Sequence, residues 1–90
     1  MAARIDYKAS VAKDLQGLGQ TTAERILRKV ERALRSEGHQ GKSLSGEFAG
    51  LYRLQVGDYR VIYASTDNGY LVLRIGHRRE VYRKGRPGIG

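Results

Sequence analysis

The spacing of apolar residues changes once along the chain, near Gly38, and this change limits the folds that are open to it. Before Gly38, where we expect a helix to end, apolar side chains recur every three or four residues over 23–34 and form one stripe. After Gly38, apolar and polar residues alternate over 51–56 and 59–64, as in half-buried strands. The pattern predicts the α+β class, with helices packed against a sheet.

One strand and two helices are expected before this change. Residues 4–7 alternate polar with apolar and predict a short first strand. Apolar residues at helical spacing over 11–18 predict a first helix that ends at Gly19. The second helix is expected to have Thr21 as its N-cap, and Glu24, three residues later, completes a capping box.

Three consecutive strands are expected after it. Residues 51–56 and 59–64 flank Gly57-Asp58, a candidate for a two-residue turn. Asn68-Gly69 is the strongest hairpin signal in the chain, and residues 70–76 follow it as the last strand. The predicted order is β-α-α-β-β-β, with both helices packed on one face of a small antiparallel meander.

Two-residue turns would bring polar side chains to one face of this sheet. In that register Gln55 lies opposite Arg60, and Arg60 lies opposite His77. Arg53 then shares a face with these three residues. The opposite face carries the apolar side chains that can take the helices: Tyr52, Leu54, Val61 and Tyr63. A slip of one residue in either hairpin would undo this arrangement.

Length and composition narrow the class of protein further. The 90 residues fit one domain, and the basic, glycine-rich end, residues 83–90, is expected to be a flexible tail. The chain has no cysteine, which excludes a disulfide scaffold, a zinc ribbon and a thiol nucleophile. The longest apolar runs, such as 61–64, are too short to span a bilayer, and the N-terminus has no apolar signal segment. We expect a cytoplasmic protein with no membrane partner.

Positive charge dominates the chain and indicates its partner. Seventeen Lys and Arg against nine Asp and Glu give a net charge of +8, with an isoelectric point near 10.2. Such an excess repels itself in the folded state, so a polyanionic partner is its usual reason. Nucleic acid is the first candidate, followed by an acidic protein or an anionic membrane, and a merely solvated basic surface stays open.

Several common kinds of active site are missing from the sequence. The glycines are scattered and form no phosphate-binding loop. His39 and His77 lie far apart, and no acidic cluster has the spacing of metal ligands, so we expect no metal and no cofactor. Glu80 is near His77, but both fit surface positions equally well, and no pair of histidine and carboxylate marks an ordinary acid–base ribonuclease.

The remaining candidates for chemistry are arginines interleaved with tyrosines. Guanidinium groups bind phosphate through paired hydrogen bonds, and tyrosine rings stack on unpaired bases. The set consists of Arg53, Arg60, Arg74, Arg78 and Arg79 with Tyr52, Tyr59, Tyr63, Tyr70 and Tyr82. The alternative is that the arginines are exposed strand positions, and Tyr52, Tyr59 and Tyr63 fit the sheet core better than a binding site. Tyr82 lies beyond the last strand, where a tyrosine has little core to fill.

Four blocks of the sequence resemble a known toxin family. They are Leu44-Ser-Gly46, Gly50-Leu-Tyr-Arg53, Val56-Gly-Asp-Tyr-Arg-Val-Ile-Tyr63 and Ile75-Gly-His-Arg-Arg-Glu-Val-Tyr82. Together they look like the RelE branch of the RelE/ParE superfamily, the small basic toxins of bacterial type II toxin–antitoxin pairs. The resemblance covers essentially the whole chain, and the last two blocks are specific only in combination.

The resemblance implies a fold, an activity and partners. The family's fold packs two helices on a small twisted antiparallel sheet and is related to microbial ribonucleases, in agreement with the predicted pattern. Its activity is that of a ribosome-dependent endoribonuclease, or mRNA interferase, which cleaves messenger RNA in the ribosomal A site and inhibits translation. The 2′-hydroxyl attacks the adjacent phosphate without a metal. The implied partners are a cognate antitoxin protein, in a toxin–antitoxin hetero-oligomer, and the ribosome with its messenger RNA.

The same resemblance assigns catalytic roles to Arg53, Arg60, Arg78 and Tyr82. Arg60 and Arg78 would stabilise charge on the phosphate in the transition state. Tyr82 would orient or stack on the substrate, or exchange a proton. Arg53 stands where members often carry lysine and would act as a cation.

The resemblance leaves the general base open. Gln55 stands where some members carry a second lysine, and its amide cannot act as a base. His77, directly before Arg78, is the candidate replacement because histidine exchanges protons near neutral pH. The residues expected to bind RNA or the ribosome around the site are Lys42, Gln55, Arg79, Arg83, Lys84 and Arg86.

Two other functions stay open. The ParE toxins of the same superfamily bind DNA gyrase and cleave no RNA, but they generally lack the arginine and tyrosine set. A non-catalytic RNA-binding relative is favoured if Gln55 reflects lost chemistry.

Overall fold

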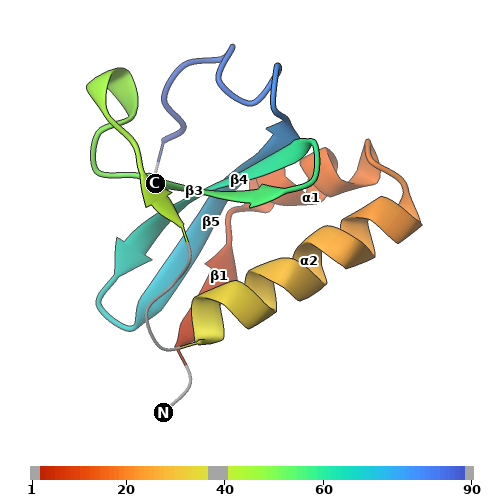
Figure 1. Cartoon of the computed structure of the whole chain (residues 1–90), viewed down its shortest axis with the longest axis horizontal. Helices are drawn as coiled ribbons and strands as arrows, with labels where there is room; N and C mark the ends of the chain where they lie inside the picture. Colours follow the sequence, from red (N-terminus) through yellow and green to blue (C-terminus); the bar gives the residue numbers. More distant parts are fainter. Residues whose placement is uncertain (1–2, 37–40, 89–90) are drawn as a thin grey trace.

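The helices and strands follow the order expected from the sequence, with one short strand added (Figure 1). The computed structural model describes residues 3–36 and 41–88. The elements are β1 Arg4–Tyr7, α1 Ala9–Gln16, α2 Gln20–Arg35, β2 Lys42–Ser43, the 3-10 helix η1 Gly46–Phe48, β3 Tyr52–Val56, β4 Tyr59–Thr66 and β5 Gly69–His77. The predicted class and element order are confirmed, and β2 is the additional strand, at one edge of the sheet.

The five strands form one mixed sheet in the order β1-β5-β4-β3-β2. β3, β4 and β5 pair antiparallel, as predicted, and β2 adds a further antiparallel pair with β3. β1 differs because it pairs parallel with β5, from Arg4 opposite Gly69 to Tyr7 opposite Val72. Parallel neighbours need a long crossover connection, and the helices lie within the chain that joins these two strands. Both helices pack on one side of the sheet, which we call the helix face (Figure 1).

α2 begins without the capping box that the sequence predicted. Its N-cap is Gly19, at φ 80°, and no side chain caps it. Glycine has no Cβ to clash at positive φ, so Gly19 can turn the chain sharply and the helix starts at Gln20, before Thr21. The side chain of Gln20 donates a hydrogen bond of 3.2 Å to Glu24, whose predicted role in the box is therefore wrong.

The ends of the helices differ from the predicted ones. α1 ends at Gln16, with Gly17 as its C-cap, and does not continue to Gly19. The last residue of α2 is Arg35, and the predicted end at Gly38 lies outside the described residues. Neither helix of the described ranges is long and apolar enough to cross a membrane.

The helix face of the sheet carries the larger core. The helices contribute Val11, Ile26, Val30, Ala33 and Leu34, and the strands contribute Leu54, Val56, Val61, Tyr63, Val72 and Ile75. The ring of Tyr63 is fully buried, stacked on Tyr52 at 5.5 Å and edge-on to Tyr70 at 5.6 Å. Tyr52 and Tyr59 pack against the same core. The prediction that these tyrosines form core rather than a binding site is confirmed for Tyr52, Tyr59 and Tyr63.

The opposite side of the sheet, which we call the second face, has a cover of its own that the sequence did not predict. Its buried residues are Leu51, Ile62, Ala64, Leu73 and Val81, with Leu44, Phe48, Leu71 and Tyr82 packed against them. Phe48 comes from η1, and Val81 and Tyr82 come from the turns after β5. The segment after the last strand is therefore part of the folded structure.

The basic tail is fastened to the rest of the protein as far as residue 88, where we expected flexibility from residue 83. Arg86 donates hydrogen bonds to the carbonyls of Glu47 and Ala49, at 3.2 and 2.6 Å. Lys8 donates one of 2.6 Å to the carbonyl of Gly88, and Pro87 is buried. These hydrogen bonds join the tail to residues that are distant in the sequence, so the composition of the tail alone could not predict them.

The β3–β4 hairpin has the predicted turn and register. Gly57, at φ 58°, and Asp58 form the turn. Gln55 lies opposite Arg60, and Arg53 lies opposite Ile62. The predicted face shared by Arg53, Gln55 and Arg60 is confirmed, and it is the second face.

The β4–β5 hairpin has a different turn and register from those predicted. Asp67 and Asn68 form the turn, and Thr66 pairs with Gly69. Gly69 belongs to β5 because β1 runs beside it, and a Cβ at Gly69 would overlap the backbone of Arg4. A register shift lies between Ile62 and Tyr63 of β4.

This shift places His77 on the wrong face for the predicted cluster. Gly76, not His77, lies opposite Arg60, and His77 lies opposite Tyr59. Since Tyr59 packs against the core of the helix face, His77 shares that face with it. The prediction that His77 stands beside Arg53 and Arg60 is therefore wrong.

Candidate functional site

Three polar side chains of the second face come from the two central hairpin strands. Arg53 and Gln55 lie on β3, and Arg60 lies on β4, opposite Gln55. Lys42 of β2 lies opposite Arg53 and is exposed, so it adds a second cation to the same face. Like charges that are directly opposite each other destabilise a sheet, which makes this pair more consistent with a ligand than with stability.

Arg60 is held firmly at the end of the site. Only 9% of the residue is exposed. Its Nη1 donates to the carbonyls of Gly57 and Tyr59, at 3.1 and 3.0 Å. A guanidinium has five N–H donors, and among residues 3–36 and 41–88 only Nη1 of Arg60 has partners, so the groups on Nε and Nη2 remain for a ligand. Arg60 therefore combines a fold-stabilising role with a fixed cationic position.

The segment after β5 brings Arg78 to the same end of the sheet. We call residues 78–85 the C-terminal turn. The backbone N–H of Arg78 donates a hydrogen bond of 2.8 Å to the carbonyl of Asp58, the neighbour of Gly57 in the β3–β4 turn. Because Arg60 bonds to Gly57 and Arg78 bonds to Asp58, both arginines meet at one turn. The side chains of Arg78 and Arg79 are exposed.

Tyr82 has more core to fill than the sequence indicated. It is half-buried, and its ring stands edge-on to Phe48, with centroids 5.3 Å apart and an interplanar angle of 80°. Such aromatic pairs contribute beyond the area they bury. Tyr82 is therefore anchored through its ring to the second face, on the side of the sheet that carries Arg53 and Arg60.

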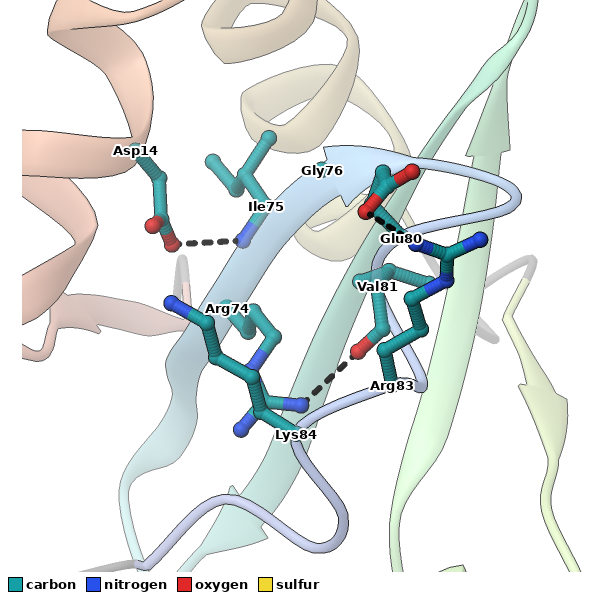
Figure 2. A pocket seen from close by; sticks show the side chains of 8 residues that line it. All are labelled: Asp14, Arg74, Ile75, Gly76, Glu80, Val81, Arg83 and Lys84. Atoms are coloured by element: carbon teal, nitrogen blue, oxygen red, sulfur yellow. Dashed lines mark hydrogen bonds and ion pairs between the residues drawn. The ribbon is translucent and has the colours of Figure 1, made fainter.

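Arg74 organises the C-terminal turn, a role that sequence reasoning missed. The sequence placed Arg74 in the arginine set as a phosphate ligand or an exposed strand residue. Its Nη1 instead donates to the carbonyls of Val81 and Gly85, both at 2.8 Å, and Figure 2 shows the first of these bonds. No local pattern signals such a bond, because its partners are backbone carbonyls.

Asp14 was also missed. Its Oδ2 accepts a hydrogen bond of 3.0 Å from the backbone N–H of Ile75 (Figure 2). β1 ends beside Val72, so this edge of β5 has no strand partner further on, and a carboxylate of α1 takes its place. An aspartate on the sheet-facing side of a short helix is the one signal that could have indicated this.

A pocket of about 330 Å³ lies between α1 and the C-terminal turn. Figure 2 shows the residues that line it: Asp14, Arg74, Ile75, Gly76, Glu80, Val81, Arg83 and Lys84. Arg83 forms an exposed ion pair with Glu80, at 3.5 Å. Two of the residues expected to bind RNA, Arg83 and Lys84, therefore line a pocket at the edge of β5.

Two other candidates are engaged elsewhere. The ring of His77 stands edge-on to that of Tyr59, with centroids 5.9 Å apart, and its Nδ1 accepts a hydrogen bond of 3.3 Å from the backbone N–H of Arg79. The guanidinium of Arg86 holds two backbone carbonyls near η1. Within residues 3–36 and 41–88, no three histidine, aspartate or glutamate side chains gather closely enough to hold a metal ion.

Comparisons with known proteins agree on one family. A sequence model described as the ParE toxin of the type II toxin–antitoxin system, parDE, matches residues 5–82. Toxin RelE of Mycobacterium tuberculosis is 36% identical over 82 residues, which are 88% of this chain and 84% of that protein.

Solved structures share the fold. A RelBE toxin–antitoxin complex from Mycobacterium tuberculosis contains a chain that superposes with a TM-score of 0.77 at 24% identity, covering 89% of this chain and 95% of that one. The isolated RelE toxin of E. coli gives a TM-score of 0.67 at 24% identity, covering 84% of each chain. At these identities the likeness concerns the arrangement of helices and strands.

Proposed function

Because the chain belongs to the RelE/ParE family of type II toxin–antitoxin toxins, we propose that it cleaves messenger RNA in the ribosomal A site. The observation that supports this most strongly is the meeting of Arg60 and Arg78 at the β3–β4 turn. Arg53 lies on the same face as Arg60, and Tyr82 packs against that face. Arginine side chains and an aromatic ring on the same side of a sheet are suited to an RNA phosphate and its base.

In the proposed reaction the 2′-oxygen of one nucleotide forms a bond to the adjacent phosphorus, and the bond from phosphorus to the 5′-oxygen breaks. The products are a 2′,3′-cyclic phosphate and a 5′-hydroxyl end. The 2′-hydroxyl loses a proton and the leaving oxygen gains one. Arg60, through Nε and Nη2, and Arg78 stabilise the charge that develops on the phosphate.

Proton transfer in this proposal does not use His77, because His77 lies on the helix face. Gln55 cannot act as a base. Of the residues given catalytic roles by the resemblance, Tyr82 is then the one that can exchange a proton, because the arginines stay protonated. Most of the rate is supplied by holding the reacting atoms in line and by fixed cations, and the ribosome presents the strand in the required geometry.

The antitoxin is the second proposed partner. The solved relatives include RelB–RelE complexes, which join a toxin to its antitoxin. A nuclease of this kind would poison its host, so we propose a cognate antitoxin that covers the cationic second face with acidic residues, or displaces the C-terminal turn, and forms a hetero-oligomer with the toxin. We place the toxin in the cytoplasm, where translation takes place.

Mapping of RNA ends tests the proposed function. The chain is induced alone in bacteria, and 5′ ends on messenger RNA are mapped with and without active translation. We expect new ends within translated regions and few ends when translation is blocked. Equal cleavage of untranslated RNA would overturn the dependence on the ribosome.

Intact messenger RNA with accumulated gyrase–DNA breaks would instead support the second candidate, an activity of the ParE type. The family model that matches is that of the ParE toxin, which keeps this candidate in the test. The arginine and tyrosine set favours the ribonuclease, because a gyrase inhibitor has no need to stabilise a phosphate in a transition state.

A further inference from the structure

A third arginine reaches the turn where Arg60 and Arg78 meet, and it comes from the helix that packs on the other side of the sheet. Arg25 lies on α2, and its Nη2 is 3.8 Å from the position that a Cβ would take on Gly57 of the β3–β4 turn. The carbonyl of the same Gly57 accepts a hydrogen bond from Arg60, and the carbonyl of Asp58 accepts one from Arg78. α2 therefore brings a cation to the end of the proposed site.

Arg25 and Arg60 are close enough to bind neighbouring phosphates of one RNA strand. Arg60 Nη1 lies 3.1 Å from the carbonyl oxygen of Gly57, which is only a few covalent bonds away from the Cβ position that Arg25 approaches. Nη2 of Arg25 and Nη1 of Arg60 are therefore no more than about 11 Å apart. The two faces of a sheet meet at the end of a hairpin, so a strand of RNA can leave the second face there and pass Arg25.

No contact within the fold explains Arg25. Its side chain is exposed, and within residues 3–36 and 41–88 it has no hydrogen bond and no ion pair, not even with Asp58, the acidic residue of the turn. Arg28 and Lys29 follow it at three and four residues, and like charges at this spacing destabilise a helix. The helix dipole favours cations in the last turn of α2, and Arg25 lies well before it. A negatively charged ligand would offset this cost.

The position of Arg25 selects which phosphate is its ligand. A guanidinium binds phosphate through two hydrogen bonds, and the proposed function gives the cleaved phosphate to Arg60 and Arg78. Arg25 approaches the turn from the helix face, so the phosphate within its reach is the next one along the strand. That phosphate has the same charge in the substrate and in the transition state. Its contact with Arg25 therefore contributes equally to both states and strengthens binding without changing the chemical step.

We propose that Arg25 binds a phosphate of the messenger RNA next to the one that is cleaved, and so holds the strand across the β3–β4 turn. This inference rests on the proposed function, and it adds to the site a substrate contact made by α2.

A matched pair of variants tests this contact. Arg25→Gln and the control Arg28→Gln each remove one positive charge from exposed positions of α2. Glutamine is a good helix former, so both variants should stay folded, which circular dichroism checks. Single-turnover cleavage is measured against the concentration of ribosomes that carry the messenger RNA. All saturating rates should stay within about twofold of the wild type, because a contact made equally in both states does not alter them.

A messenger RNA with one neutral phosphate identifies the ligand. A methylphosphonate replaces, in turn, the phosphate on either side of the cleaved one. The sugar before it carries a 2′-O-methyl group, in the neutral and in the native message, so that no hydroxyl attacks the neutral group. At one of these positions, we expect the wild type and Arg28→Gln to need about 3–10-fold more ribosomes for the half-maximal rate than with the native message.

Arg25→Gln should need the same concentration of ribosomes for both messages, because it has no contact left to lose. Arg25→Lys should keep part of the wild-type sensitivity, since it retains the charge without the paired hydrogen bonds. The comparison of two messages within one variant cancels any contact that α2 makes with the ribosome itself.

Three outcomes would overturn the inference. The first is a wild type that responds to neither neutral phosphate. The second is an equal response of Arg25→Gln and Arg28→Gln, which would show that Arg25 does not bind these phosphates. The third is a saturating rate of Arg25→Gln that is lower by about 10²-fold or more, which would make Arg25 a ligand of the cleaved phosphate. Failure of the wild type to cleave the native message would instead overturn the proposed function.

Discussion

Replacing Arg74 by methionine tests how the C-terminal turn is held against the sheet. Methionine keeps an unbranched stem but removes both hydrogen bonds of Nη1, to the carbonyls of Val81 and Gly85. A hydrogen bond from a charged donor contributes about 1.5–3 kcal/mol. Arg74 and Gly85 are only half-buried, so hydrogen bonds to water replace part of this contribution. We expect Arg74→Met to lower the free energy of opening the C-terminal turn by about 2–3 kcal/mol for the two bonds together.

Native-state hydrogen exchange measures this loss locally. Three backbone amides of the C-terminal turn report its opening. The N–H groups of Val81, Arg83 and Gly85 donate hydrogen bonds to the carbonyls of His77, Glu80 and Tyr82, respectively. If the free energy of opening the turn falls by about 2 kcal/mol, the open population rises about 30-fold, and the three amides should exchange about 30-fold faster. Amides in the middle of β4 should exchange at the wild-type rate.

Arg83→Met is the matched control. Arg83 lies in the same turn, but its ion pair with Glu80 is 3.5 Å long and its side chain is 71% exposed. Exposed pairs contribute about 0–1 kcal/mol, so this variant should change exchange little. If Arg74→Met and Arg83→Met exchange alike, the turn is held by the packing of Val81 and Tyr82, and the role given to Arg74 is wrong.

Three further predictions concern the core and the base. Gly41→Ala would place a methyl group on the hydroxyl of the buried Tyr63, so urea unfolding should show a free energy of unfolding lower by about 1–3 kcal/mol. The double variant Gly41→Ala/Tyr63→Phe lacks this hydroxyl and should regain part of that free energy. Burial raises the pKa of Tyr63 to about 12, whereas in the unfolded chain this hydroxyl loses its proton near pH 10. The contribution of the protonated Tyr63 to the free energy of unfolding is therefore complete below about pH 10 and is lost as the pH rises to about 12. Urea unfolding at both ends of this range should show a loss that Tyr63→Phe lacks, and equal losses in both proteins would contradict it. His77→Gln should cleave at nearly the wild-type rate, whereas removal of a general base lowers the rate by about 10²–10⁴-fold. A loss of that size would show that His77 takes part in proton transfer.

Local turn chemistry predicted one hairpin register and not the other. Gly57 has φ 58°, and the preference of glycine for positive φ sets the β3–β4 turn as the sequence predicts. Gly69 has a second neighbour, the backbone of Arg4 in β1, and the parallel pairing of β1 claims it for the strand. A pattern read along the chain does not contain that contact, which is why the turn was predicted one residue too late. The face of His77 was predicted wrongly because no pattern in the sequence signals the register shift between Ile62 and Tyr63.

For the arginines, too, features set by neighbouring residues could be predicted, whereas contacts to distant parts of the chain could not. The shared face of Arg53 and Arg60 follows from alternation along two strands and one short turn. The bonds of Arg60 and Arg74 to backbone carbonyls depend on where later segments of the chain fold, and the sequence gives no local signal for them. The cover of the second face by Phe48 and Tyr82 has the same origin, because it joins segments that are distant in the sequence.

Single-turnover cleavage of ribosome-bound messenger RNA tests the central claim most directly. Arg78 is exposed, so Arg78→Ala leaves the core intact, and it can be compared with Arg83→Ala in the same turn. At saturating ribosomes we expect Arg78→Ala to cleave about 10²–10³-fold more slowly than the wild type, because it removes one fixed donor to the transition state. Arg83→Ala should keep nearly the full rate. Cleavage by Arg78→Ala at the wild-type rate once bound would contradict the account and make Arg78 a docking residue only.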